Sequence, residues 1–456
     1  MKPLVKIPRR LLLAALDDLK RPHHFAGERL GFFSFRQSLH QKRPFILCYE
    51  YHLVPDDQYI RDNTCGGRIN ATAIQTAMAR ALQDGSGQLW VHTHGRRGHP
   101  APSGTDLAEG PKVVRSLANA KKTVMQGWAI ISEEGTWGQV RARDGHLHDF
   151  NDLAVVGFPL VVPSRTVMPR QKDRLARLLE YLYGRHLPST AERYDRQSFL
   201  GADSQRIFES SKVAVAGLGG GGSHINQQLA HIGFQDVVLC DSDRVEFTNL
   251  NRLVGATYWD AIRKRFKTHI ASRLFRSVQL SAHIDDRPLN WQEKIEAIRE
   301  CDIVFGSIDS FAGRRDLEAF CRAHMIPFID IGMVVNRPDG KPPEISGQTI
   351  ISMPDEPCMH CMGFLNEETL AKEVQDYNAG PQPQVVWPNG ILASAAVGEA
   401  VSLLTHWSGD SLPAAKIELR GSRLTMADSK LLPALKGVKC GHYRLSSMGD
   451  PRFTML

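Results

Sequence analysis

The sequence predicts an α/β protein built from two domains of different construction. First, the chain has 456 residues, about three times the length of a typical domain. Second, short apolar runs separated by turn residues fill residues 1–165, as in an α+β domain with a substantial sheet. Third, from residue 193 onward apolar strands alternate with helical stretches, which is typical of a doubly wound α/β sheet. We therefore expect domains over residues 1–165 and 193–456, joined by a helical linker over residues 166–192.

Composition and charge place the chain among ordinary globular proteins. Hydrophobic residues make up 42% and charged residues 23%, which excludes a disordered or collagen-like chain. The net charge of +7 suits an acidic ligand such as a nucleotide and does not predict nucleic acid as a partner. The 8 cysteines are irregularly spaced, which indicates reduced thiols and one metal site rather than disulfides. Because no apolar run reaches the ~18 residues that a bilayer requires, we expect a cytoplasmic protein with no membrane partner.

The first domain is predicted to begin with an amphipathic helix and to continue as a sheet. The apolar residues Leu11–Leu16 follow Arg9-Arg10, but they are too few, and too soon followed by Asp17-Asp18, for a signal peptide. Apolar runs bounded by turn residues predict the strands. These runs are Phe45–Tyr51, Leu89–Val91, Val124–Ser132 and Ala154–Val162. In the linker, leucines at helical spacing predict a helix over Gln171–Gly184.

A glycine-rich turn between a strand and a helix predicts a nucleotide site in the second domain. Its strands are marked by the apolar runs Val213–Ala216, Val237–Cys240, Ile303–Phe305 and Phe328–Ile331. The first strand leads into Gly217-Leu-Gly-Gly-Gly-Gly222, and a helix is expected over Ser223–His231. Glycines let phosphate oxygens approach backbone N–H groups, and a helix N-terminus attracts anions. Asp241, at the end of the next strand, is placed to hold a ribose hydroxyl.

The residues after Asp241 favour a triphosphate among the ligands that such a turn can bind. No G-K-[ST] ending follows the glycines, which excludes a Walker-type phosphate loop, whereas a nicotinamide dinucleotide would also fit the turn. Asn249, Arg252 and Lys267 follow Asp241 closely. Clustered cations beside a phosphate loop suit ATP and a pyrophosphate leaving group better than a dinucleotide.

Residues 190–425 resemble the ThiF/MoeB/ubiquitin-activating superfamily, whose fold is Rossmann-like. The matching motifs, in chain order, are Arg193-Tyr-Asp-Arg196-Gln, the glycine run, Asp241-x-Asp-Arg-Val-x-x-x-Asn249-Leu-x-Arg252, Lys267, Ser307-Ile-Asp309, Cys358-Met-His-Cys361 and the helix that begins Asn389-Gly-Ile. The resemblance implies an enzyme that adenylates the C-terminal glycine of a ubiquitin-like protein with ATP and Mg²⁺. It also implies a homodimer, in which Arg196 reaches phosphate across the subunit interface.

The resemblance further implies a role for each matching residue. The residues expected to bind the nucleotide are Arg196, Gly217, Gly219, Gly220, Gly222, Asp241, Asn249, Arg252 and Lys267. Asp309 would bind Mg²⁺, and together with Arg252 and Lys267 it would stabilise the charge that moves during the reaction. Because the attacking carboxylate is already ionised, no side-chain base is required.

The sequence departs from the thioester-forming members of this family. Those members carry a reactive cysteine between the C-x-x-C motif and the final helix, whereas residues 362–388 of this chain contain no cysteine. We therefore expect the protein to hand on its acyl-adenylate. The alternative is that Cys358, Cys361 or Cys440 substitutes for the missing nucleophile.

A structural zinc site is predicted toward the C-terminus. The Cys358-x-x-Cys361 spacing lets two thiolates bind one tetrahedral metal ion. Family members supply a second C-x-x-C pair, for which this chain offers Cys440 and His442. Three cysteines and one histidine would close the site; the alternative is an unmetallated knuckle with free thiols.

A catalytic zinc site is predicted in the first domain. His92 and His94 follow an apolar strand, on which alternate residues point the same way, and Asp106 comes shortly after. Two histidines and one aspartate leave a fourth position for water. With Glu28 and Ser103 included, residues 20–165 resemble the JAMM/MPN-type zinc peptidases, although 8 residues separate His94 from Ser103, one more than usual.

The resemblance to those peptidases implies how the site would work. The two histidines and Asp106 would bind Zn²⁺, which lowers the pKa of water toward ~7. Glu28 would take a proton from that water and return it to the leaving amine, and Ser103 would stabilise the oxyanion. Glu50, which lacks the glycine context around Glu28, is the alternative base.

Both domains resemble enzymes that act at the C-terminus of a ubiquitin-like protein. We therefore predict a bifunctional enzyme of a bacterial ubiquitin-like modification system, which activates the modifier and whose peptidase domain processes or removes it. The expected partners are the ubiquitin-like protein and a conjugating enzyme or a direct acceptor protein. Two alternatives remain: adenylation for sulfur transfer in thiamine or molybdopterin synthesis, and a non-catalytic scaffold that binds a ubiquitin-like protein.

Overall fold

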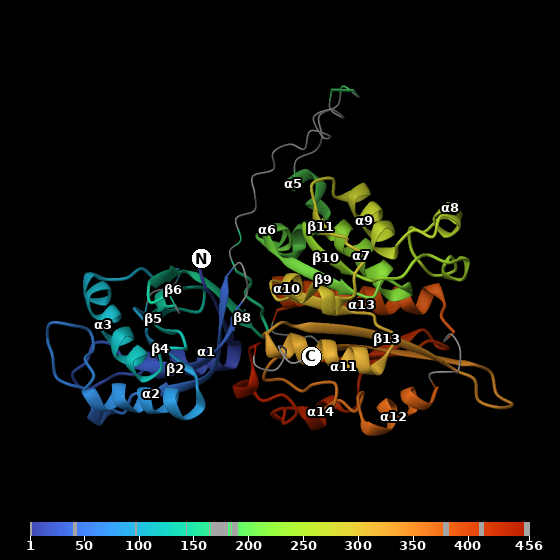
Figure 1. Ribbon diagram of the computed structural model, residues 1–456. Coiled ribbons are helices and arrows are strands. Elements are labelled where there is room, and N and C mark those ends of the chain that lie inside the picture. Colours follow the sequence, from blue (N-terminus) through green and yellow to red (C-terminus); the bar gives the residue numbers. More distant parts are fainter. Residues whose placement is uncertain are drawn as a thin grey trace. The chain divides into compact units, whose positions relative to one another are not determined.

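The computed structural model describes residues 2–39, 43–95, 98–142, 144–163, 165, 181–182, 184, 190–376, 383–409 and 415–450. The chain divides into two compact units (Figure 1). Unit 1 consists of Met1–Ser164, Ala323–Met325 and Tyr443–Leu456, and unit 2 consists of Arg165–Arg322 and Ile326–His442. The predicted boundaries at 165 and 193 stay a prediction, and they differ from the units in the last residues, which belong to unit 1. The predicted linker helix lies largely outside the described residues.

Unit 1 is an eight-stranded sheet with the strand order β7-β6-β5-β4-β2-β3-β1-β8. Its strands are β1 (Leu4–Pro8), β2 (Leu30–Leu39), β3 (Pro44–Leu53), β4 (Gly87–His92), β5 (Gln126–Ile131), β6 (Thr136–Arg141), β7 (Leu147–Phe150) and β8 (Asp152–Val156). Its helices are α1 (Arg9–Leu19), α2 (Ala71–Asp84) and α3 (Gly104–Ala120), with the 3-10 turns η1 (Asp56–Gln58) and η5 (Leu445–Ser447). Three predicted strands coincide with β3, β4 and β5, and the predicted N-terminal helix is α1. The fourth, Ala154–Val162, overlaps β8 only as far as Val156, where the strand ends.

Helices cover both faces of the unit 1 sheet, because successive side chains of a strand point to opposite faces. On β2, Phe33 belongs to the core cluster that α1 joins through Leu12. The neighbouring Phe32 belongs to the opposite cluster, where Ala77 of α2 and Leu117 of α3 are buried. The sheet is therefore packed against α1 on one side and against α2 and α3 on the other.

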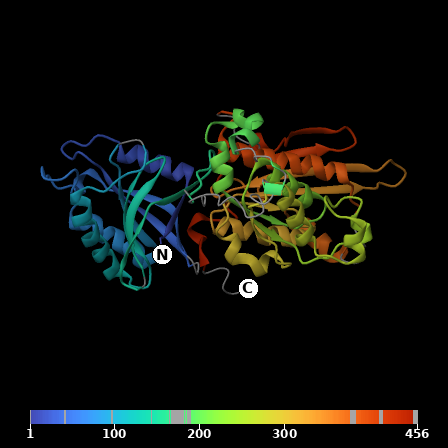
Figure 2. The ribbon, with the colours of Figure 1, turned by 90° about the horizontal axis from the view of Figure 1, so that it is seen from above.

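Unit 2 is a second eight-stranded sheet, with the order β11-β10-β9-β12-β13-β14-β15-β16. Its strands are β9 (Lys212–Ala216), β10 (Asp236–Cys240), β11 (His283–Asp285), β12 (Ile303–Gly306), β13 (Phe328–Asn336), β14 (Glu344–Ser352), β15 (Lys416–Arg420) and β16 (Thr425–Asp428). The first five strands of this order run parallel, as expected for a Rossmann-like α/β fold, whereas β14, β15 and β16 are antiparallel. The alternation predicted the doubly wound parallel part of this sheet, and it did not predict the three antiparallel strands. The connection from β13 to β14 is a hairpin, and a parallel pair would need a longer crossover. Its tip protrudes from unit 2 in both views (Figures 1 and 2).

The helices of unit 2 are mostly short. They are α5 (Thr190–Arg193), α6 (Ser204–Ser210), α7 (Gly220–Ile232), α8 (Tyr258–Ile262), α9 (Lys267–Val278), α10 (Ile295–Ile298), α11 (Phe311–Ala323), α12 (Glu367–Asp376), α13 (Val386–Thr405) and α14 (Leu432–Leu435), with the 3-10 turns η2 (Asp195–Leu200), η3 (Phe247–Asn249) and η4 (Trp291–Lys294). α7 packs against α9 and α13, and it begins at Gly220 rather than at the predicted Ser223. Within the described ranges, no helix combines the length and the apolar character that crossing a bilayer requires.

Candidate functional site

Unit 2 contains a cavity of about 390 Å³ where β9, β10 and β12 end and β13 passes. The carboxyl ends of parallel strands meet at one edge of a doubly wound sheet, and ligands bind there. The glycine turn, Asp241, Lys267 and Asp309 all line this cavity. The fold therefore brings together predicted site residues from four separate segments of the chain.

The glycine turn is too tight to accommodate side chains at four of its positions, Gly217, Gly220, Gly221 and Gly222. Gly217 has a φ of +86°, and its N–H donates a hydrogen bond to the Cys240 carbonyl oxygen at 2.8 Å. A Cβ on Gly222 would lie 1.8 Å from the Gly217 carbonyl oxygen, and one on Gly220 would lie 2.4 Å from Asn389 Nδ2. Because the turn leads directly into α7, the positive end of that helix dipole faces the cavity.

Gly222→Ala is expected to destabilise unit 2, because the added methyl group must displace the Gly217 carbonyl. Overpacking of this kind costs about 1–3 kcal/mol of unfolding free energy. Urea unfolding measures the loss. Gly219→Ala is the matched control, because a Cβ on Gly219 would meet nothing within 4 Å. Equal destabilisation by the two substitutions would contradict the expected role of Gly222.

Asp241 is 8% exposed, and its carboxylate accepts hydrogen bonds from the backbone N–H groups of Leu218 and Asp243, each at 2.8 Å. Burial raises the pKa of this carboxyl, and the Lys267 ammonium, 3.7 Å away, opposes the shift. Lys267 Nζ also lies 2.7 Å from a carboxylate oxygen of Asp243, which was not predicted as a site residue. A bound polyphosphate would therefore compete with Asp243 for Lys267.

Asp309 is exposed at the mouth of the same cavity, where its Oδ1 accepts a hydrogen bond from Gln384 Nε2 at 3.2 Å. Carboxylate oxygens of this kind are ligands that Mg²⁺ prefers. Arg314, on the first turn of α11, also lines the cavity and was not predicted. Its buried guanidinium donates to the Ile308 carbonyl at 2.7 Å and contacts the buried Asp330. Its position at the start of a helix that follows Asp309 is the sequence feature that could have identified Arg314.

Three predicted phosphate contacts, Asn249, Arg252 and Arg196, are not among the described residues that line the cavity. Asn249 Oδ1 accepts a hydrogen bond from the Glu246 backbone N–H at 3.0 Å and so caps η3. Arg252 donates to the Thr248 carbonyl at 2.8 Å, and its side chain lies beside the glycine turn. Arg196 is exposed on η2. Their roles toward phosphate stay predictions.

Four side chains of unit 2 form the cysteine–histidine tetrad that was expected to hold zinc. The ligand atoms of Cys358, Cys361, Cys440 and His442 lie within 4.8 Å of one another. Cys358 Sγ is 3.6 Å from Cys361 Sγ, and His442 Nδ1 is 3.5 and 3.4 Å from these two sulfurs. Tetrahedral bonds of ~2.3 Å to sulfur and ~2.0 Å to nitrogen place ligand atoms about 3.5–3.8 Å apart. The tetrad thus has the size and the donor atoms that a structural zinc ion requires.

Unit 1 contains a larger cavity, of about 1320 Å³. On its wall, His92 Nε2 lies 3.2 Å from His94 Nε2 and 3.1 Å from Asp106 Oδ1, and His94 Nε2 lies 3.2 Å from Asp106 Oδ2. Zinc bonds of ~2.0–2.1 Å in a tetrahedral site separate the ligand atoms by about 3.3 Å. The three side chains therefore fit the same kind of ion and leave one position open.

The local sequence explains why Ser103 and Asp106 meet at this point. Ser103 is the N-cap of α3: its hydroxyl accepts from the Asp106 N–H at 3.2 Å, and the Asp106 carboxylate accepts from the Ser103 N–H at 2.7 Å. Ser103 Oγ also donates to Asp106 Oδ2 at 2.7 Å. Burial opposes ionisation of Asp106, but the hydrogen bonds from His92 and Ser103 hold its pKa below the usual range. A hydroxyl has a single proton, and Ser103 already donates it to Asp106. The role of Ser103 toward an oxyanion therefore stays a prediction.

Glu28 lines the same cavity, with its carboxylate within 4.8 Å of ring nitrogens of His92 and His94. Its backbone N–H donates to the Gly66 carbonyl oxygen at 2.8 Å, and a Cβ on Gly66 would lie 2.5 Å from Glu28 Oε2. Glu50, the alternative base, is exposed on β3 and is not part of the cavity wall as far as it is described. The fold thus brings Glu28, and not Glu50, to the expected ligands.

Comparison with known proteins gives matches for unit 2. The sequence model of the ThiF family matches residues 193–434. Molybdopterin-synthase adenylyltransferase of Escherichia coli K12 is 29% identical over 224 residues, which cover 47% of this chain and 82% of that protein. The sulfur carrier protein ThiS adenylyltransferase of the same strain is 29% identical over 267 residues, covering 57% and 97%. A crystal structure of E. coli MccB with ATP is 19% identical with a TM-score of 0.44, covering 57% of this chain and 79% of that chain.

Proposed function

The chain belongs to the ThiF family, and on this premise we propose that it adenylates the C-terminal glycine of a ubiquitin-like protein. It is an adenylyltransferase that uses ATP. The observation that carries the proposal is the unit 2 cavity, in which Asp241, Lys267 and Asp309 surround the glycine turn at the start of α7.

The cavity residues account for the charges in this reaction. The ionised carboxylate of the modifier attacks the α-phosphorus of ATP, an acyl–phosphate bond forms, and pyrophosphate leaves. Asp241 would hold the ribose, while Lys267 and the α7 N-terminus would reduce the repulsion between the carboxylate and the triphosphate. Asp309 would hold Mg²⁺, whose charge helps to neutralise the pyrophosphate.

The cysteines support release of an acyl-adenylate rather than an enzyme thioester. All eight lie in the described part of the chain: Cys48, Cys240, Cys301 and Cys321 are buried, Cys358, Cys361 and Cys440 belong to the tetrad, and Cys65 lines the unit 1 cavity. Among these thiols, Cys240 lines the unit 2 cavity. Burial raises the pKa of Cys240 to about 12, so this thiol is protonated at neutral pH and is a poor nucleophile.

Replacing the cysteines outside the tetrad with alanine is expected to leave the transfer of the modifier intact. Intact mass spectrometry of the protein, mixed with Mg-ATP and a ubiquitin-like protein that ends in glycine, measures the outcome. We expect a modifier carrying AMP and no adduct that a thiol reagent reverses. A thioester adduct that a thiol reagent cleaves by acyl exchange, and that one of these substitutions removes, would contradict the adenylate hand-over. The absence of any product would contradict the proposed function.

We further propose that unit 1 is a zinc peptidase of the JAMM/MPN type, which hydrolyses the amide bond after the C-terminal glycine of the modifier. The close approach of His92, His94 and Asp106 beside Glu28 in a large cavity supports this proposal. A zinc ion bound there would acidify water and polarise the amide carbonyl. Glu28 would accept a proton from the attacking water and deliver it to the amine as the C–N bond breaks.

The two reactions are chemically linked. Hydrolysis in unit 1 releases the glycine carboxylate that unit 2 adenylates, whether the peptidase trims a precursor or removes the modifier from a target. This link favours a bacterial ubiquitin-like modification system over sulfur transfer for cofactor synthesis, which needs no amide hydrolysis. The tetrad would hold a structural zinc ion. A homodimer and a conjugating enzyme remain predictions.

A further inference from the structure

A buried arginine follows Glu28 in the chain, and we infer that the hydrogen bonds of Arg29, Asp56 and Tyr59 position the Glu28 carboxylate against the unit 1 metal ligands. The inference rests on the proposed peptidase function. It assigns these three residues a positioning role, since none of them lines the described part of the cavity wall.

Glu28 needs such support because it lies outside regular secondary structure. β2 begins only at Leu30, so no ladder of strand hydrogen bonds holds Glu28. A general base must be held to within about 0.5 Å of its productive position, and a displacement of ~1 Å can cost about 100-fold in rate. The residues that follow Glu28 therefore decide how well its carboxylate is placed.

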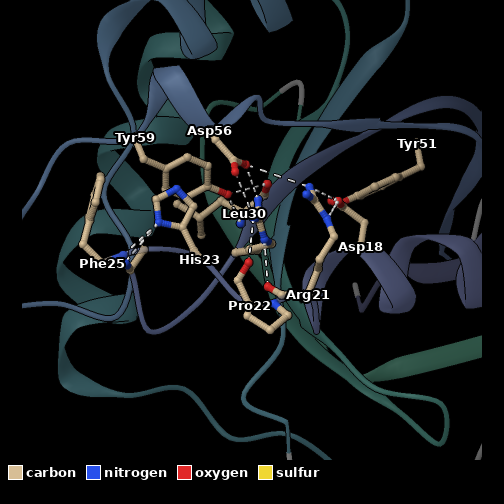
Figure 3. A network of polar contacts seen from close by, with 11 residues as sticks. Asp18, Arg21, Pro22, His23, Phe25, Leu30, Tyr51, Asp56 and Tyr59 are labelled. Atoms are coloured by element: carbon tan, nitrogen blue, oxygen red, sulfur yellow. Dashed lines mark hydrogen bonds and ion pairs between the residues drawn. The ribbon is translucent and has the colours of Figure 1, made fainter.

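Arg29 is the first residue after Glu28, and its side chain is held by several hydrogen bonds. Its side chain is 2% exposed, and its guanidinium donates to Asp56 Oδ1 at 2.7 Å and to the carbonyl oxygens of Arg21 and Pro22, each at 2.8 Å. These partners come from η1 and from the segment after α1, and Figure 3 shows them gathered around Leu30. Asp56 raises the pKa of Arg29 through this hydrogen bond, so the pair is ionised.

Leu30, the second residue after Glu28, is held by Tyr59. The Tyr59 hydroxyl accepts a hydrogen bond from the Leu30 N–H at 2.8 Å and donates to the Leu30 carbonyl at 3.3 Å (Figure 3). Leu30 is the residue of β2 that pairs with His92 of β4. On the other side, the Glu28 N–H donates to Gly66. Three consecutive residues are thus tied to fixed partners, and the last of them is in register with a metal ligand.

Asp56→Asn tests the inference, because it keeps the shape of the side chain and removes the charge that Arg29 binds. Asp56 is 45% exposed, so the change leaves no buried cavity. In the zinc-loaded full chain we expect kcat for amide cleavage to fall about 10- to 100-fold, with KM and bound zinc unchanged. Tyr59→Phe is the second variant, should Asp56→Asn fold poorly. Asp152→Asn is the matched control, because it breaks the 3.1 Å Arg43–Asp152 pair of the same unit.

A readout besides activity separates positioning from folding. The visible absorption bands of Co²⁺ at the unit 1 site, measured with zinc retained in the cysteine tetrad, respond to hydrogen bonds made to the metal's ligands. We expect Glu28→Gln and Asp56→Asn to shift these bands in the same direction, and Asp152→Asn to leave them in place. Unshifted bands in both Asp56→Asn and Tyr59→Phe would overturn the inference, as would wild-type kcat in an enzyme that Glu28→Gln inactivates. A wild-type protein that cleaves nothing would instead refute the proposed function, and the Co²⁺ bands would still decide the positioning.

Discussion

Glu28→Gln slows amide cleavage by about 10²- to 10⁴-fold and leaves zinc bound, which is the largest effect that we expect in unit 1. Glutamine matches the shape of glutamate but cannot accept and return a proton. The proposed metal ligands are His92, His94 and Asp106, and the substitution leaves all three in place. Cleavage of a ubiquitin-like precursor, followed by mass spectrometry with zinc content measured in parallel, checks the result.

Glu50→Gln is the matched control for this experiment. Glu50 lies on the neighbouring strand β3, and its carboxylate is exposed 3.7 Å from His52. We expect the Glu50 variant to cleave at the wild-type rate. Undiminished cleavage by the Glu28 variant would disqualify Glu28 as the base. If only the Glu50 variant lost activity, Glu50 would be the base instead.

Asp309→Ala is expected to abolish the ATP–pyrophosphate exchange that the cognate modifier stimulates, with a loss of at least about 100-fold. Asp309 is an exposed carboxylate of the unit 2 cavity, in which the Lys267 ammonium contacts Asp241 and Asp243. Without it, Mg²⁺ would lose its expected protein ligand, and the charge of the departing pyrophosphate would be less well neutralised. Exchange of radiolabelled pyrophosphate into ATP measures the effect.

Asp316→Ala removes a carboxylate from the next helix, α11, without touching the cavity as described. Asp316 pairs with Arg315 at 2.9 Å on the protein surface. We therefore expect this control variant to exchange pyrophosphate at the normal rate. If exchange persisted after Asp309→Ala, the Mg²⁺ ligand would have to be another residue.

Local sequence patterns were sufficient for most strands and for the glycine turn. A strand in a sheet that is covered on both faces is apolar at successive positions. The run Val213–Ala216 has this pattern, and it forms most of β9. The antiparallel extension β14–β16 was not predicted. In β15, Ile417 and Leu419 alternate with charged residues, but five residues are too few to show whether a strand pairs in parallel or antiparallel.

The candidate metal site in unit 1 was predictable in its ligands and less so in its base. Strand alternation and a helix cap are local features, and they bring His92, His94 and Asp106 together. The choice between Glu28 and Glu50 depends on long-range register. β2 lies between β3 and β4, and its pairing of Leu30 with His92 brings the segment that holds Glu28 next to the ligands. No local pattern encodes that pairing.

In the nucleotide site, by contrast, residue type alone did not predict which side chains line the cavity. Asn249 and Arg252 are of the types that bind phosphate, but the same types also cap helices and bind carbonyls, which is how this structure uses them. Arg314 escaped prediction because its place in the cavity depends on the buried Asp330, which lies on a different strand.

The last described residues of the chain have a consequence for how the protein is made. Ser38 Oγ donates to Asp450 at 3.0 Å, Arg36 donates to the Ser446 carbonyl at 2.9 Å, and Met448 is buried with Leu4 in a core cluster of unit 1. The unit that leaves the ribosome first is therefore finished last, after all of unit 2 has been synthesised. An N-terminal fragment made without residues 443–450 would lack Met448 from the core cluster of unit 1, so a stable unit 1 requires a chain that continues through unit 2.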